Sequence, residues 1–397
     1  MSNSRKARVD RSRLATVRQR EEALFRSHRP RSASLHARAS QHMPGGVPMS
    51  WMKGLYRTPT IFIDRGEGPR FFDVDGKGYL DFNVCDLSMT MGYGPEPIVR
   101  AVASQVAKGA HFLLPTDDAI EVAELLAART GLPYWQFTLS ASGANTEVLR
   151  TARFLTGRPK IILFSGHYHG HLDDTLVELR GDRPVPSLLG IPEDATANTE
   201  VLPFNDLEAL EAALARRDVA LVLTEPALTN CNVVLPQPGY LAEVRELTQR
   251  YETLLCLDEA HTFQFDYGGL TGAWQLATDF LVLGKGVGSG VSFGLYGMSA
   301  EVAAAFEKHI DVDIGPAGML GPRSGYCLSQ SLPLNYDEAS RSLDYELIDT
   351  RRVFMANRGI WDAIASAGPQ ASFVHTNADI DEYLAVAEQF LGEIVAS

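Results

Sequence analysis

Short apolar runs alternate with amphipathic stretches through the middle of the chain. Five runs have the length and composition of buried parallel strands, and they start near Trp135, Lys160, Val219, Leu254 and Phe280. Apolar residues recur at three- and four-residue spacing, as in amphipathic helices, over residues 97–109, 117–129 and 240–253. Strands that alternate with helices predict an α/β fold, with a mainly parallel sheet and helices on both of its faces.

The segments before this region have a different pattern. Residues 1–40 are rich in arginine and carry apolar residues at roughly helical spacing. The acidic remainder of the chain favours a helix that packs on a neighbouring subunit over an arm that binds nucleic acid. Residues 61–82 alternate as strands do, and Asp75-Gly76 is typical of a hairpin turn between two of them.

The C-terminal part returns to a regular pattern. It predicts a strand over residues 325–328 and helices over residues 337–357 and 379–395. We therefore divide the chain into an N-terminal arm (1–59), a large domain (60–314) and a smaller α+β C-terminal domain (315–397).

Composition and charge narrow the class of protein. The 397 residues are 45% hydrophobic, enough for a substantial core, and the formal net charge of −13 argues against binding to nucleic acid. No apolar run has the length of a membrane span, and the N-terminus lacks the apolar core of a signal peptide. We expect a cytoplasmic protein whose cysteines are reduced and buried, namely Cys85, Cys231, Cys256 and Cys327.

Two of the predicted strands end beside a charged residue. The run from Leu254 ends at Asp258, and the run from Phe280 is followed by Lys285, 27 residues after Asp258. Because the carboxyl ends of parallel strands line the ligand crevice of an open α/β sheet, both side chains are placed for chemistry. Desolvation disfavours an ammonium, so a lysine there can form a Schiff base with a carbonyl. Taken alone, Lys285 is better interpreted as an ordinary exposed lysine.

Small and polar residues mark further candidate sites. Ser140-Ala141-Ser142 lies at a strand-to-helix turn, where free backbone N–H groups favour a phosphate, although a plain helix N-cap has the same signature. Residues 167–171 carry three histidines at alternate positions, a spacing that fits zinc poorly. Another buried strand ends at Glu225, for which a surface acid is an equally good interpretation.

Together these residues resemble the class III (fold type I) aminotransferases, which depend on pyridoxal phosphate, and especially the glutamate-1-semialdehyde aminomutase group. The run 140–144 is similar to the family's Ser-Gly-Thr-Glu-Ala, the run 166–170 to its Gly-x-Tyr-His-Gly, and Glu225-Pro226 to its Glu-Pro pair. The spacing of Asp258 and Lys285 also agrees with the family. The resemblance implies a fold type I transferase with a seven-stranded, mainly parallel sheet and a smaller C-terminal domain.

The resemblance assigns roles to single residues. Asp258 would hold the pyridine nitrogen protonated, and Lys285 would form the Schiff base and move a proton between substrate carbons. Tyr168 would stack on the pyridine ring, and no metal is implied. The further residues that we assign to the cofactor are Ser140, Ala141, Ser142, His169, Glu225, Ala260 and His261.

The expected substrate site departs from the family. Where the aminomutase group has an arginine that clamps the substrate carboxylate, this chain has Trp51-Met52-Lys53. A bidentate clamp is absent there, and Lys53 is only a point-charge substitute. Trp51 and Met52 indicate a more apolar pocket, and Asp86 lies in a nearby loop that also differs. We therefore assign substrate contacts to Trp51, Lys53 and Asp86, and the aminomutase substrate is not carried over.

We predict an aminotransferase that moves an amino group between an amine or amino acid and a keto acid or aldehyde through a Schiff base on Lys285. The alternatives are an aminomutase or racemase, and a paralogue that binds the cofactor without turnover. The paralogue is considered because residues 318–323 join segments that lie several dozen residues apart in relatives, through a deletion or an omitted segment. The family implies a homodimer or a dimer of dimers, and we expect no nucleic-acid or membrane partner.

Overall fold

The computed structural model describes residues 10–54, 60–181, 183–308, 344–361 and 375–394. The chain forms two compact units, Met1–Val312 and Asp313–Ser397. The junction at residues 318–323, the strand predicted over residues 325–328 and Cys327 lie outside the described residues. The division into an arm, a large domain and a small domain stays a prediction.

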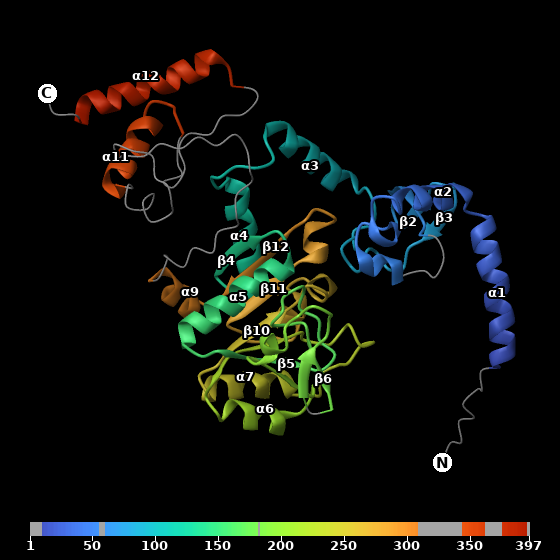
Figure 1. The fold of residues 1–397 in the computed structure, drawn as a ribbon. Helices are drawn as coiled ribbons and strands as arrows, with labels where there is room; N and C mark the ends of the chain where they lie inside the picture. The colour runs from blue at the N-terminus through green and yellow to red at the C-terminus, as the bar shows by residue number, and fades with distance from the viewer. Residues whose placement is uncertain (1–9, 55–59, 182, 309–343, 362–374, 395–397) are drawn as a thin grey trace. The chain divides into compact units, whose positions relative to one another are not determined.

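The described residues of the first unit form a seven-stranded sheet (Figure 1). The strands, in their order across the sheet, are β4 (Tyr134–Thr138), β12 (Gly294–Met298), β11 (Phe280–Leu283), β10 (Leu254–Asp258), β9 (Val219–Thr224), β5 (Lys160–Phe164) and β8 (Thr199–Leu202). β12 is antiparallel to both of its neighbours, and the other pairs are parallel. The five predicted strands and the mainly parallel sheet are confirmed.

The sequence pattern did not predict β8 or β12. β12 contains two glycines, Gly294 and Gly297, and glycine weakens the signal of a strand. Its antiparallel direction follows from the connection between Leu283 and Gly294, which is too short for the crossover that a parallel neighbour requires. The chain instead turns back and adds β12 beside β11.

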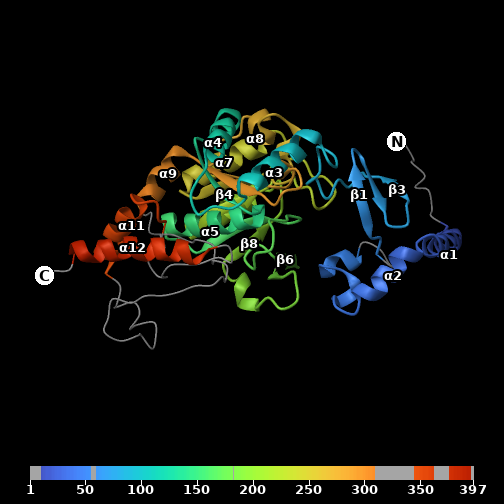
Figure 2. The same cartoon turned by 90° about the horizontal axis from the view of Figure 1, so that it is seen from above.

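Helices cover both faces of this sheet, as predicted. The helices of one face are α5 (Ala141–Thr156) and α9 (Ala300–Glu307), and those of the other are α6 (Leu207–Leu214), α7 (Tyr240–Arg250), α4 (Asp117–Thr130) and α8 (Gly269–Ala273). Figure 2 shows α5 on the opposite side of the strands from α4, α7 and α8. The helices predicted over residues 117–129 and 240–253 are α4 and α7.

Alternate side chains of the central strands divide between the two layers. In β5, Ile161 and Leu163 contact the α5 layer, whereas Ile162 and Phe164 contact the layer of α6 and α7. All four side chains are fully buried, as expected where helices cover both faces of a parallel sheet. This core fixes the strand ends from which the polar residues project.

A helix pair and a small antiparallel sheet form the N-terminal region. The bounds are α1 (Arg11–Ser27), α2 (Pro30–Ala39), β1 (Ile63–Glu67), β2 (Arg70–Asp73) and β3 (Gly78–Leu80). The predicted hairpin turn at Asp75-Gly76 joins β2 to β3 and is confirmed. Buried Asp73 stabilises it by accepting hydrogen bonds from the N–H groups of Asp75 (3.0 Å) and Lys77 (2.8 Å).

The remaining elements are short or lie between these regions. Those of the first unit are η1 (Pro44–Gly46), η2 (Ser50–Gly54), α3 (Glu96–Lys108), β6 (Val177–Arg180), β7 (Arg183–Pro186), η3 (Glu193–Thr196), η4 (Phe263–Phe265) and η5 (Lys285–Gly288). The described part of the second unit contains α11 (Tyr345–Ala356) and α12 (Asn377–Ile394), which contact each other through Phe354 and Phe390. Among the described helices, none combines the length and apolarity needed to cross a membrane.

The cysteine prediction is wrong in part. Cys256 is buried in β10 and Cys231 is half-buried, but Cys85 is exposed. All three are free thiols. Cys85 differs because it lies on a turn at residues 84–90 that borders the pocket, rather than in a strand of the sheet.

Candidate functional site

One pocket of about 540 Å³ lies at the carboxyl ends of β9, β10 and β11. Its lining residues are Cys85, Ser88, Met89, Tyr93, Leu139, Ser140, Ala141, Ser142, Tyr168, His169, Gly170, Glu225, Asp258, Ala260, His261, Lys285, Gly290, Val291, Ser292 and Phe293. All ten residues that the sequence assigned to a cofactor are among them. Its size is within the range of small-molecule sites, and its position agrees with the crevice rule for open α/β sheets.

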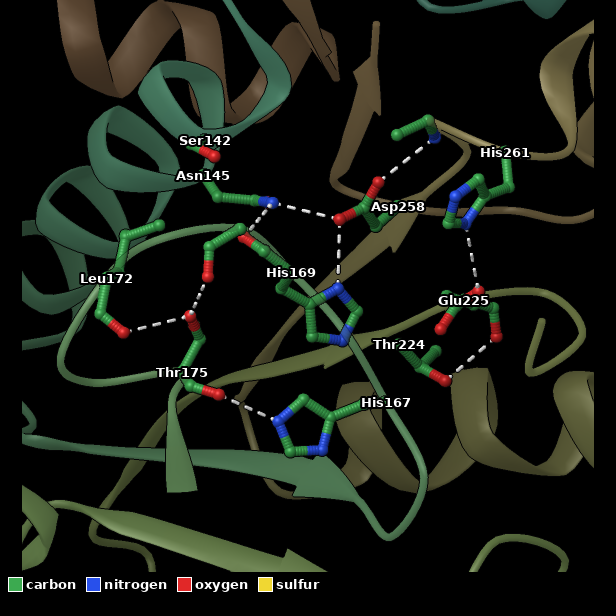
Figure 3. Close-up of polar contacts among 12 residues, drawn as sticks. Ser142, Asn145, His167, His169, Leu172, Thr175, Thr224, Glu225, Asp258 and His261 are labelled. Atoms are coloured by element: carbon green, nitrogen blue, oxygen red, sulfur yellow. Dashed lines mark hydrogen bonds and ion pairs between the residues drawn. The ribbon is translucent and has the colours of Figure 1, made fainter. Parts of the chain in front are cut away.

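Asp258 is the buried acid of this pocket (Figure 3). Its carboxylate accepts hydrogen bonds from Asn145 Nδ2 (2.8 Å), His169 Nδ1 (2.9 Å) and the Ala260 N–H (3.0 Å). Burial raises the pKa of Asp258, but the hydrogen bonds from His169, Asn145 and Ala260 outweigh it, so the net pKa lies below the ordinary value. The site therefore holds a fixed negative charge at the end of β10.

Asn145 is a site residue that the sequence analysis missed. It is 1% exposed, and its side-chain amide also donates to the His169 carbonyl at 3.0 Å. An asparagine on the buried face of a helix is unfavourable unless its side chain has partners. The sequence contains that signal, because Asn145 lies three residues after Ser142 and is therefore on the same side of α5 as Ser142.

The histidines of the loop 167–171 are engaged separately. His169 donates from Nδ1 to Asp258, while its Nε2 has no hydrogen-bond partner within the described chain. His167 stacks on His169 with 5.3 Å between ring centroids, and its two nitrogens lie 2.8 Å from the carbonyls of Phe164 and Thr175. Burial and then His169 lower the pKa of His167, so the ring is neutral and donates to one of these carbonyls. The contacts fix the loop that carries Tyr168.

The first turn of α5 forms one wall of the pocket. Ser140 is its N-cap, and the Ser140 hydroxyl accepts from the Gly143 N–H at 3.1 Å. The Ser142 hydroxyl accepts from the His171 N–H at 3.3 Å. The free N–H groups at this helix N-terminus, with the two serine hydroxyls, are suited to an anion.

Lys285 lies on the connection that follows β11. Its backbone has a positive φ of 51°, and its side chain is 21% exposed. The Lys285 ammonium forms an ion pair with Asp86, which lies far from Lys285 in the sequence. Asp258 pairs with Val282 in the register of β10 and β11, so the acid and the lysine leave neighbouring strands at the same end.

A second group of ionisable side chains adjoins Lys285. Glu225 is 2% exposed and accepts from the backbone and side chain of Thr229, so the interpretation of a surface acid is wrong. His261 lies between acids, with Nδ1 3.8 Å from Glu225 and Nε2 3.5 Å from Asp86. Burial lowers the pKa of His261, but Asp86 and Glu225 outweigh it and raise the pKa to about 9. His261 is therefore a cation at neutral pH.

The three predicted substrate residues are not brought together. Asp86 contacts Lys285 and His261. Trp51 and Lys53 are exposed on η2, and no residue of η2 is among the described residues that line the pocket. Tyr168, the predicted lid, lines the pocket and is 41% exposed, with its pKa raised by burial and then by Asp86. The substrate roles of Trp51 and Lys53 stay predictions.

The pocket residues fit the chemistry of pyridoxal phosphate. An ionised buried carboxylate suits a protonated pyridine nitrogen, a helix N-terminus suits a phosphate, and an amine suits an aldehyde. Asp258, the first turn of α5 and Lys285 supply these groups around a single cavity. Among the described lining residues no arginine is present, so the phosphate would depend on N–H groups and hydroxyls.

Comparisons with known proteins agree with this chemistry. The profile of the class III aminotransferases matches residues 53–311. The glutamate-1-semialdehyde 2,1-aminomutase of Desulforudis audaxviator (strain MP104C) is 35% identical over 358 residues, which span 88% of this chain and 81% of that protein.

Solved structures show the same similarity. A glutamate-1-semialdehyde aminomutase from Pseudomonas aeruginosa PAO1, solved also in complex with PMP, has a TM-score of 0.73 and 29% identity, over 98% of this chain and 100% of that one. An omega-transaminase from Sphaerobacter thermophilus has a TM-score of 0.65 and 26% identity, over 90% of this chain and 97% of that one. The resemblance and the fold class predicted from the sequence are both confirmed.

Proposed function

The chain belongs to the class III aminotransferases, and from this membership we propose that it transfers an amino group between an amine or amino acid and a keto acid or aldehyde, with Lys285 as the reacting amine. Pyridoxal phosphate is the cofactor of this family, so the predicted cofactor is confirmed. The chain is thus a pyridoxal-phosphate-dependent enzyme, and the transfer between two substrates is the finer proposal.

One observation carries the proposal. Asp258 and Lys285 leave neighbouring parallel strands and line a single pocket, which also contains the first turn of α5. When bound there, the cofactor would supply an electron-withdrawing ring that stabilises a carbanion at the substrate carbon. An acid at one end of the cavity and an amine on its wall are the groups that such a ring requires.

The pocket residues would then act as follows. The negative charge of Asp258 holds a proton on the pyridine nitrogen, and hydrogen bonds from His169 and Asn145 keep Asp258 ionised and fixed. Ser140 and Ser142 would bind the phosphate. Lys285 would hold the cofactor and would take and return the proton at the substrate carbon as a general base and acid.

An aminomutase is the second candidate, because the relative from Desulforudis and the solved neighbour from Pseudomonas both have that name. A screen of amine donors, followed by the absorbance of the bound cofactor, separates the two candidates. Turnover that needs a second, carbonyl-bearing substrate supports transfer between molecules. Product that forms without an acceptor supports the aminomutase, interconversion of enantiomers supports a racemase, and a bound cofactor that no amine converts supports a paralogue without turnover.

Chemical trapping tests the role of Lys285. The full chain is incubated with pyridoxal phosphate, reduced with borohydride, digested and mapped by mass spectrometry. We expect the cofactor on Lys285, none on that peptide in Lys285→Ala, and normal labelling in the control Lys160→Ala. Lys160 is a suitable control because its side chain is 27% exposed, close to the 21% of Lys285, and it lies at the start of β5 rather than in the pocket. Labelling of another lysine would contradict the proposal.

A further inference from the structure

Residues 84–87 form a turn of unusual backbone conformation beside the pocket. Val84, Cys85, Asp86 and Leu87 have positive φ angles of 46°, 53°, 52° and 67°. For residues with a Cβ atom this left-handed region is unfavourable, and successive residues seldom adopt it. Such a run persists only where the surrounding contacts hold it, and it occurs most often at functional sites.

Hydrogen bonds at both ends of the turn hold this conformation. The Asp81 carboxylate accepts from the N–H groups of Asn83 (2.8 Å) and Val84 (3.0 Å) and from the Tyr93 hydroxyl (2.7 Å). The Asn83 side chain accepts from the Asp86 N–H at 3.1 Å, and the Met89 N–H donates to the Val84 carbonyl at 2.8 Å. The turn is therefore fixed from within.

The connection that carries Lys285 packs against the same turn. A Cβ atom at Gly286 would lie 2.8 Å from Thr90 Oγ1 and 3.1 Å from the Leu87 carbonyl oxygen, so only glycine allows this close approach. The two segments are far apart in sequence, yet their contact brings the Asp86 carboxylate to the Lys285 ammonium.

Asp86 is shared between two cations. Its Oδ2 contacts Lys285 Nζ on one side and lies 3.5 Å from His261 Nε2 on the other. On its other side His261 Nδ1 lies 2.8 Å from Thr229 Oγ1 and 3.8 Å from Glu225, which is 2% exposed. Acids and cations thus alternate from the buried Glu225 through His261 and Asp86 to Lys285. His261 lowers the pKa of Asp86 most, against burial, and Lys285 lowers it further, so Asp86 stays ionised.

We propose that Asp86 and His261 are positioning residues for Lys285: the turn presents the Asp86 carboxylate to hold Lys285 Nζ in the pocket, and His261, anchored through Thr229 beside Glu225, competes for that carboxylate. The ion pair with Asp86 restrains the Lys285 side chain, and the competing contact of His261 with the same carboxylate weakens that restraint. This inference rests on the proposed function, in which Lys285 is the reacting amine.

The two residues should act with opposite signs. Replacing Asp86 by a neutral residue removes the ion-pair partner of Lys285, so Nζ is released to react. Replacing His261 by a neutral residue removes the competing cation, so Asp86 holds Lys285 more firmly. The effects are modest, about two- to fivefold in rate, because the Asp86 side chain is 69% exposed.

The test measures the reactivity of Lys285 in the full chain without its cofactor. N-acetoxysuccinimide is a small probe: Lys285 Nζ attacks its ester carbonyl, an amide forms, N-hydroxysuccinimide leaves, and the amine proton passes to the buffer. Peptide mass spectrometry gives the acetylation rate of each lysine from pH 6 to pH 10. At pH 7 we expect about threefold faster acetylation of Lys285 in Asp86→Asn and about twofold slower acetylation in His261→Gln.

The substitutions are chosen to keep the fold. Asparagine is among the residues that adopt positive φ most readily, so Asp86→Asn suits the turn. Glutamine can place a donor near the position of His261 Nε2 without its charge. The matched control is Asp218→Asn, which breaks the ion pair of Lys160 and Asp218 (2.6 Å) and should change the acetylation of Lys160 only.

Two outcomes would overturn the inference. Equal Lys285 rates in all three proteins across the pH range, with a normal response in the Asp218→Asn control, would show that Asp86 and His261 do not act on Lys285. Faster acetylation in both variants would show that they merely shield the pocket. A failure of the proposed function is distinguishable, because borohydride trapping on another lysine in the wild type would reveal it while leaving the acetylation result intact.

Discussion

Substitution of Gly170 by alanine tests the contact between the 167–171 loop and the first turn of α5. A Cβ atom at Gly170 would lie 2.1 Å from Ser142 Oγ and 2.8 Å from Ser142 Cβ, and the backbone φ is +93°. The backbone strain costs about 1–2 kcal/mol and the clash about 1–3 kcal/mol. We expect the free energy of unfolding to fall by about 2–5 kcal/mol, and cofactor binding to weaken because Ser142 must move.

Gly131 provides a matched control for this substitution. It has a similar φ of +78° at the C-cap of α4, and nothing lies within 4 Å of the added Cβ atom. Gly131→Ala should therefore lose only the strain of about 1–2 kcal/mol. Urea unfolding of the full chain, followed by circular dichroism, measures both losses, and titration with pyridoxal phosphate measures binding. Equal losses in the two variants, with unchanged cofactor affinity, would refute the reasoning about Ser142.

Three further predictions concern charge and assembly. Asp258→Asn should keep the cofactor bound but lower kcat by about a hundredfold or more, because the fixed charge is lost; near-normal kcat would contradict the role of Asp258. Because the pKa of His261 is raised from 6.5 to about 9, its contribution to stability is complete below pH 6.5 and is lost as the pH rises through 9. The free energy of unfolding should fall by about 3 kcal/mol across that window, and by much less in His261→Gln; identical slopes would contradict this. The protein should be a homodimer or a dimer of dimers in solution, since α3 and the segment after it expose Val99, Val106, Phe112 and Leu113; light scattering that finds a stable monomer at micromolar concentration would contradict it.

The sequence predicted the parts of the fold and site that depend on local pattern. Asp258 and Lys285 could be found because each lies at or just after the end of an apolar run. A charged residue at the carboxyl end of a buried strand lies at the edge of the sheet that lines the ligand crevice. The five predicted strands and the hairpin at Asp75-Gly76 have equally local signals. The roles given to the lining residues agree with their shared pocket but await the experiments above.

Other features depend on contacts that no local pattern reports. The ion pair of Asp86 with Lys285 joins segments far apart in the chain, and it depends on a backbone conformation that Val84 and Leu87 disfavour. β12 was not predicted because its two glycines weaken the local signal of a strand. Its stability comes instead from pairing with its two neighbours, β11 and β4. The burial of Glu225 likewise follows from its contacts with Thr229 and His261 rather than from its position after β9.

The connection between β11 and β12 leaves the pocket wall and returns to it. Pairing of Leu283 with Leu295 fixes its two ends side by side, while Lys285 near one end and Val291 near the other both line the cavity. Substitutions at Val291 and Ser292 can therefore reshape the cavity wall while the strand that places Lys285 keeps its register, whereas Gly290 has a φ of +90° and an added Cβ atom there would lie 2.7 Å from Met89 Sδ. If the proposed function holds, directed evolution of substrate range is best begun at those two positions.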